Sequence, residues 1–107
     1  MEFFNTIFGG KSSTENVATL IKEGAFLVDV RTPGEFADGH VKGSTNIPLD
    51  QISAQLSKFK GKEQIVVFCR SGMRSSQAKS ILQQNGFTNV TNGGTWIAIN
   101  KIISKNS

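Results

Sequence analysis

The sequence has few of the residues that form disulfides or bind structural metal ions in small domains. Its 107 residues include one cysteine and one histidine. A single cysteine cannot form an internal disulfide, and the chain has neither a Cys-x-x-Cys pair nor a Cys/His cluster with zinc-site spacing. The sequence therefore predicts no disulfide framework and no structural metal.

Dense charge runs and long apolar runs are also missing. The net charge is +4, but the lysines are scattered, which favours a solvated surface over nucleic-acid binding. A mild positive field of this kind would gather small anions. Residues 1–11 are apolar at first, yet they lack a basic region and are broken by Asn5 and Gly9-Gly10. They fit neither a signal peptide nor a membrane span, so we expect a cytoplasmic protein without a membrane partner.

The length leaves room for one domain with one core. A hydrophobic fraction of 37% and eight phenylalanines argue against disorder. We expect the domain to span residues 12–105. Residues 1–11 are interpreted as an edge strand or a segment packed on the domain, with a partner-docking segment as the alternative.

Strands and helices alternate along the chain. Residues 25–30 and 65–68 are apolar runs typical of strands buried on both faces of a parallel sheet. Shorter strands are expected at 44–47 and 87–91. Helices are expected from Ser12, with Glu15 completing a capping box, from a second capping box at Thr32, at 49–59, after residue 74 and from Trp96. This order predicts an α/β fold, with a mainly parallel, twisted sheet of about five strands and helices on both faces.

The chain's cysteine lies between the 65–68 strand and the helix that follows it. Cys69 should therefore face a helix amino end at the carboxyl edge of the sheet, where α/β proteins bind ligands. Backbone N–H groups of the loop, the helix end, Arg70 and Arg74 all favour a thiolate. The alternative is an inert buried cysteine, but a polar, cationic, Gly-containing loop is poor core material.

These residues resemble the single-domain rhodaneses, the thiosulfate sulfurtransferases. Cys69–Ser75 is similar to the family's active-site loop, and three further segments match its other signatures: residues 27–31 (Leu-Val-Asp-Val-Arg), 33–48 (with Gly-His and Asn-Ile-Pro) and 92–94 (Asn-Gly-Gly). The resemblance covers roughly residues 12–103. Trp96 follows the glycine pair sooner than the family pattern leads one to expect, which affects the last helix but not the chemistry.

The resemblance implies a catalytic Cys69 that becomes a persulfide. Substrate contacts are expected from the loop (Arg70, Ser71, Gly72, Met73 and Arg74) and from Arg31. Arg31 has two interpretations, an ion pair with Asp29 or Glu35 and an anion contact, and one guanidinium can serve both. Asp29, Glu35 and Ser75 are expected to support the site structurally.

Four other residues or segments are expected outside the chemistry. A thiolate already favoured by its loop needs no general base, so His40 is interpreted as structural. Asn46 is expected in a turn and Trp96 in the core. Asn92-Gly93-Gly94 is expected to be a flexible connection in which the glycines allow close approach to other backbone.

The predicted function is transfer of a sulfane sulfur from thiosulfate, or another small anionic donor, to cyanide or a thiol acceptor, including a protein thiol. No cofactor is expected. A cysteine phosphatase or arsenate reductase is a rival, but Arg74 follows Cys69 by five residues, one fewer than in Cys-x5-Arg cradles. The other rival is a sulfur-relay or partner-binding module that carries a persulfide and turns over weakly.

Overall fold

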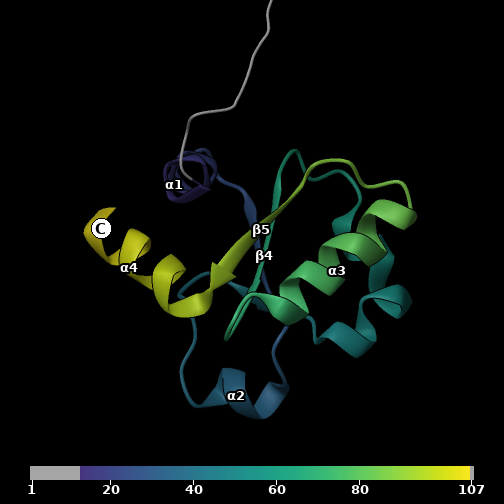
Figure 1. The fold of residues 1–107 in the computed structure, drawn as a ribbon, viewed down its shortest axis with the longest axis horizontal. Coiled ribbons are helices and arrows are strands. Elements are labelled where there is room, and N and C mark those ends of the chain that lie inside the picture. Colours follow the sequence, from purple (N-terminus) through teal and green to yellow (C-terminus); the bar gives the residue numbers. More distant parts are fainter. Residues whose placement is uncertain (1–12, 107) are drawn as a thin grey trace, which may run out of the picture.

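A parallel sheet lies at the centre of the structure, which is a computed structural model that describes residues 13–106 (Figure 1). Its strands are β2 (Phe26–Asp29), β3 (Thr45–Asn46), β4 (Ile65–Cys69) and β5 (Val90–Thr95). The α-helices are α1 (Ser13–Lys22), α2 (Pro33–Ala37), α3 (Met73–Gln84) and α4 (Trp96–Asn106). Two 3-10 helices, η1 (Leu49–Gln51) and η2 (Ser53–Phe59), connect β3 to β4.

The strand order is β3-β2-β4-β5, and every neighbouring pair is parallel. The predicted parallel α/β sheet is thus confirmed, although residues 13–106 contribute four strands instead of about five. The edge strand considered for residues 1–11 lies outside the described residues. Among those described, no helix combines the length and apolarity that crossing a bilayer would need.

Alternating side chains of β4 divide the core between the two faces of the sheet, because successive residues of a strand point to opposite faces. Ile65, Val67 and Cys69 belong to one buried cluster with Ala78 and Leu82 of α3. The other cluster contains Val66 and Phe68 of β4, with residues of α1 and α4. Figure 1 shows α1 and α4 on one side of the strands and α3 on the other, so the helices cover both faces as predicted.

Helix ends follow their sequence signals where the structure describes them. Thr32 caps α2 with the predicted box: its side chain accepts from the Glu35 N–H, and Glu35 accepts from the Thr32 N–H. Gly24 and Gly86 follow α1 and α3 with φ of +90° and +92°, the left-handed conformation that glycine adopts at low cost. The capping box predicted for Ser12 and the Glu15 side chain lies outside the described residues.

Two element predictions were wrong. Residues 49–59 form the two 3-10 helices instead of one helix, and the backbone leaves the helical region inside η2, at Gln55 (φ −124°, ψ 32°). The last strand begins and ends later than predicted, at Val90–Thr95, and includes Asn92-Gly93-Gly94. The pairing shifts register there, from Val67 with Asn92 to Phe68 with Gly94, so Gly93 is the extra residue of a β-bulge.

Candidate active site

The candidate site lies where β2 and β4 end. Asp29 pairs with Phe68 in the parallel ladder, so Asp29, Arg31 and Cys69 share the carboxyl edge of the sheet, as predicted. The chain leaves β4 at Cys69 and enters α3 through Gly72, whose φ of +95° is a left-handed conformation. This turn directs the first N–H groups of α3 back toward the cysteine.

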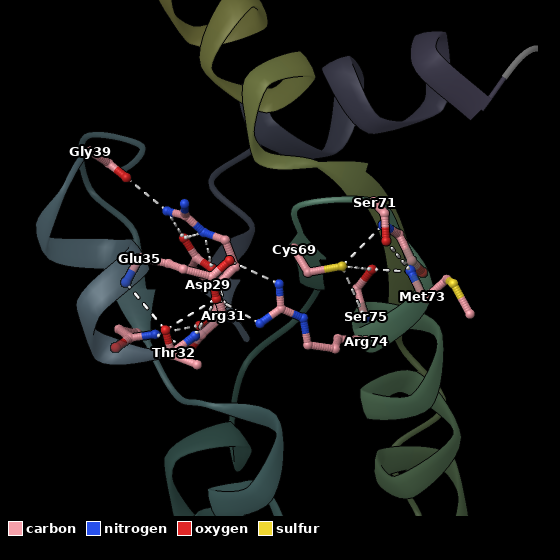
Figure 2. A network of polar contacts seen from close by, with 12 residues as sticks. Asp29, Arg31, Thr32, Glu35, Gly39, Cys69, Ser71, Met73, Arg74 and Ser75 are labelled. Atoms are coloured by element: carbon pink, nitrogen blue, oxygen red, sulfur yellow. Dashed lines mark hydrogen bonds and ion pairs between the residues drawn. The ribbon is translucent and has the colours of Figure 1, made fainter.

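Hydrogen-bonding groups of the loop converge on the sulfur of Cys69 (Figure 2). The N–H groups of Gly72 and Ser75 point at Sγ, with N···S distances of 3.0 and 3.4 Å, and the Ser75 hydroxyl oxygen is 3.5 Å away. Burial on its own would raise the pKa of the Cys69 thiol, but hydrogen bonds from Ser75, Gly72 and Ser71 together outweigh it, and the pKa is lowered. The loop therefore favours the thiolate, mainly through hydrogen bonds.

Cys69 is nevertheless fully buried, with a relative exposure of 0%. Its side chain joins the cluster of Val28, Val30 and Val67 on the inner side, while the loop covers the sulfur on the outer side. In contrast, Met73, at the start of α3, is 74% exposed. The sulfur thus has no exposed surface and lies beneath the polar backbone of the loop.

Arg74 has a partner that the sequence did not predict. Its guanidinium forms a bidentate ion pair with Glu35 of α2, with N–O distances of 2.7 and 3.0 Å (Figure 2). The Arg74 hydrogen bonds, with help from the Thr32 N–H, lower the pKa of Glu35 from 4.5 to about 2. Glu35 in turn raises the pKa of Arg74. This pair ties the beginning of α3 to α2.

Arg31 is held by Asp29 and is almost fully buried, at 3% exposure. The Asp29 carboxylate accepts the Arg31 backbone N–H at 3.0 Å and forms an ion pair with Nη2 at 2.7 Å. Nη2 also donates to the Gly39 carbonyl. The amide of Asn46 donates to the carbonyls of Asp29 and Arg31, so Asn46 is a strand residue that fixes this edge, and its assignment to a turn was wrong.

Trp96 lies beside the site and is only partly buried. Its ring lies 4.5 Å from the Arg31 guanidinium carbon, in a cation–π contact. Both residues line a cleft of about 260 Å³ whose other walls are Glu35, Asp38, Gly39, Arg70 and Ile97. Trp96 also packs against the core cluster of Val66 and Phe68, so the predicted core contact is present, but its place at the cleft was not predicted. Its early position after the glycine pair was the available signal, because α4 begins with it directly after β5.

The remaining predicted site residues lie in or near the loop. Arg70 and Ser71 are exposed, and Arg70 lines the cleft.

His40 is exposed and stacks on Phe36, with its Nδ1 2.8 Å from the Phe36 carbonyl, which fits the structural interpretation. Within residues 13–106, no three His, Cys, Asp or Glu side chains are grouped as a metal site requires.

Comparison with known proteins places this arrangement in a family. Residues 13–94 match the model of the rhodanese-like domain. The chain belongs to the rhodanese-like domain family. A sulfurtransferase of Allochromatium vinosum is 39% identical to this rhodanese-like domain over 70 residues, which cover 65% of each chain. Thiosulfate sulfurtransferase PspE of Escherichia coli is 36% identical over 69 residues, covering 63% of this chain and 66% of that protein.

The fold comparison agrees with the sequence comparison. The solved structure of a rhodanese with anions from Escherichia coli matches 70% of this rhodanese-like domain and 91% of its own chain, with a TM-score of 0.64 and 32% identity. The first curated relatives are matched over 54% to 66% of their own length. Sulfurtransferases are thus among its relatives, which supports sulfur transfer in general.

Proposed function

We propose that this rhodanese-like domain transfers a sulfane sulfur from thiosulfate, or another small anionic donor, to a thiophilic acceptor through a persulfide on Cys69. The observation that carries the proposal is the set of N–H donors of Gly72 and Ser75 around Sγ. Such donors stabilise a thiolate before the reaction and a persulfide anion after it. No cofactor enters the scheme. A lone reactive thiol is kept reduced in the cytoplasm, which is the location we propose.

The exchange has two balanced steps. The Cys69 thiolate attacks the outer sulfur of thiosulfate; a new S–S bond forms, the S–S bond of thiosulfate breaks, and sulfite leaves with the bonding electrons. Cyanide or a thiolate then attacks the terminal sulfur of the persulfide, and the Cys69 thiolate leaves. Because the chain has no second cysteine, the acceptor comes from outside.

The arginines have different parts in this proposal. Arg70 is exposed at the cleft and is the guanidinium most able to contact the donor's sulfonate oxygens. Arg31 lines the same cleft while Asp29 holds it. Arg74 is bound by Glu35, so a sulfonate must share or displace that carboxylate to reach it. We therefore propose Arg70 as the main donor contact, with Arg31 and Arg74 adding positive charge around it.

Access to the sulfur involves the loop of Ser71, Gly72 and Met73. Since Cys69 has no exposed surface, the donor reaches Sγ when this loop is displaced. Met73 is largely exposed and Ser71 is exposed as well, so the movement loses little side-chain packing. It does have to break the hydrogen bonds that the Gly72 carbonyl accepts from Ser75 and Asn92.

Two alternative functions make different predictions. A sulfur-relay module that passes its persulfide to a specific protein is favoured by the exposure of Met73 (74%) and Ile97 (54%), which could meet an apolar partner surface. A cysteine phosphatase is disfavoured, because the loop is one residue shorter than a Cys-x5-Arg cradle and Arg74 is already paired with Glu35. Efficient release of phosphate from an aryl phosphate would reverse this order.

An intact-mass spectrum of the reduced protein after mixing with thiosulfate tests the proposal. We expect the protein to gain the mass of one sulfur atom and to lose it when cyanide is added. The Cys69→Ser variant should gain nothing, because an alcohol near its free pKa is a poor nucleophile toward sulfur. A wild-type spectrum without the added sulfur, or the same addition on the serine variant, would refute the Cys69 persulfide. Fast loading with slow cyanide turnover would favour the relay function.

A further inference from the structure

Asn92 makes polar contacts with the reactive loop that its position in β5 would not lead one to expect. Its Oδ1 accepts a hydrogen bond from the Ser75 hydroxyl at 2.7 Å, and its Nδ2 donates to the Gly72 carbonyl at 3.2 Å. Gly72 and Ser75 are the two residues whose N–H groups point at Cys69 Sγ. One side chain thus holds both ends of the cradle around the sulfur.

The β-bulge in β5 creates this placement. Asn92 pairs with Val67, so its side chain lies on the α3 face of the sheet, the face that also carries Cys69. Gly93 is the extra residue, and a Cβ there would lie 2.8 Å from Val66 Cγ1 on the opposite face. The chain then turns at Gly94 (φ +84°), whose N–H donates back to Asn92 Oδ1 at 2.9 Å and fixes the amide orientation.

We propose that Asn92 is a positioning residue that keeps the N–H groups of Gly72 and Ser75 converging on Cys69 Sγ. Its amide acts on the sulfur through the loop and does not touch the substrate. The inference deepens the proposed function, since the same N–H groups would hold the persulfide. Its test on the thiol, however, does not require sulfur transfer to occur.

The proton of Ser75 determines what Asn92 contributes. The hydroxyl carries one proton and faces three acceptors: Asn92 Oδ1 at 2.7 Å, the Gly72 carbonyl at 3.1 Å and Cys69 Sγ at 3.5 Å. The shortest distance assigns the proton to Asn92 in the thiol state, and the S–H can then donate to the hydroxyl oxygen. When the thiolate forms, the proton can turn to the sulfur, because Gly94 still satisfies Asn92 Oδ1.

Titration of the thiolate by its ultraviolet absorbance measures the effect directly. The sequence contains one cysteine and no tyrosine, so neither a second thiol nor a tyrosinate contributes to the signal. In Asn92→Ala the loop N–H groups lose their alignment, and we expect the pKa of Cys69 to rise. At the pH where half of the wild-type thiol is ionised, the thiolate fraction should fall about threefold.

Asn89→Ala is the matched control. Asn89, like Asn92, ties two segments together through its side-chain amide. It donates to the carbonyls of Lys62 and Glu63, at the amino edge of the same sheet. The control should lower thermal stability to a similar degree and leave the Cys69 titration unchanged. Neither substitution changes a charged group at the carboxyl edge. The charged residues there are Asp29, Arg31, Glu35, Asp38, Arg70 and Arg74.

Asn92→Asp is a second variant for the case in which the alanine variant does not fold. The aspartate keeps an oxygen acceptor for Ser75 and Gly94 but loses the amide donor to the Gly72 carbonyl. It also places a negative charge near the thiolate. We expect it to raise the pKa of Cys69 as well. In either folded variant, an unchanged or lowered pKa would overturn the proposal; a lowered one would mean that Asn92 merely competes with the sulfur for the Ser75 proton.

Turnover separates this inference from the function on which it rests. We expect kcat/KM of Asn92→Ala for thiosulfate:cyanide transfer to be about threefold to tenfold lower near the wild-type midpoint, and to recover at higher pH. If kcat/KM of Asn92→Ala stays low at high pH while the pKa of Cys69 is unchanged, Asn92 has a purely structural role. If wild-type protein forms no persulfide, the sulfurtransferase proposal fails while the titration still decides the role of Asn92.

Discussion

The ion pair between Glu35 and Arg74 makes stability depend on pH in a defined way. Glu35→Gln removes the charge but retains an oxygen that can accept the Thr32 N–H, so the capping box survives the change. A pKa lowered from 4.5 to about 2 corresponds at face value to about 3 kcal/mol. The side chains of Arg74 and Glu35 are 32% and 28% exposed, so solvent screening reduces the expected loss to about 1 kcal/mol.

The direction of the pH dependence follows from the lowered pKa of Glu35. A carboxylate that is more acidic in the folded state stabilises that state fully above its ordinary pKa of 4.5, and this contribution disappears as the pH falls through about 2. Urea unfolding of wild type and Glu35→Gln at a series of pH values should therefore show a constant gap near neutrality. The gap should close between about pH 4.5 and 2.

A matched variant isolates the effect of the pair from the effect of losing any carboxylate. Glu63→Gln neutralises an exposed carboxylate that forms no ion pair within the described part of the chain. It should change the unfolding free energy by less than about 0.5 kcal/mol at every pH. If the gap between wild type and Glu35→Gln does not change with pH, or the two variants behave alike, the ion pair does not link α2 to α3 energetically.

Two further predictions concern the β-bulge and the loop arginines. Gly93→Ala should lower the unfolding free energy by about 1–3 kcal/mol in thermal melts, because its Cβ would lie 2.8 Å from a Val66 methyl group. The control Gly34→Ala, whose Cβ meets nothing within 4 Å, should leave the unfolding free energy unchanged. Equal melting temperatures for the two variants would show that β5 shifts to accommodate the methyl group. Arg70→Ala should reduce kcat/KM for thiosulfate about tenfold and leave the melting temperature unchanged, because Arg70 is exposed. Arg74→Ala should lower kcat/KM and the melting temperature together, because it also removes the ion pair with Glu35. Unchanged kinetics for Arg70→Ala would exclude Arg70 as the donor contact.

The sequence predicted well those features that neighbouring residues determine. The apolar run before Cys69, the capping box at Thr32 and the glycines that follow α1 and α3 are local patterns, and each gave the expected element. The family motifs covered nearly the whole domain, and the alternation of elements predicted the parallel sheet. These predictions succeeded because backbone preferences and hydrophobic periodicity act over a few residues.

The failures fall where distant segments meet. Asn92-Gly93-Gly94 resembles a loop by composition, but pairing with β4 and packing of Gly93 against Val66 make it a bulged strand. Residues 49–59 have a helical apolar pattern, yet the backbone leaves the helical region at Gln55, inside η2. The pairing of Arg74 with Glu35, 39 positions earlier in the chain, has no signal in the local sequence.

The sequence alone therefore determined the candidate nucleophile, its loop and the kind of sheet that presents it, because these depend on residue type and short-range order. Only the tertiary structure decided what each polar side chain binds. Arg74 binds Glu35, Arg31 binds Asp29, and Asn92 binds Gly72 and Ser75 of the loop that follows Cys69. A hydrogen bond or ion pair requires a donor and an acceptor within about 3 Å. That distance is set by how the strands and helices pack, which the order of residues in any one segment does not specify.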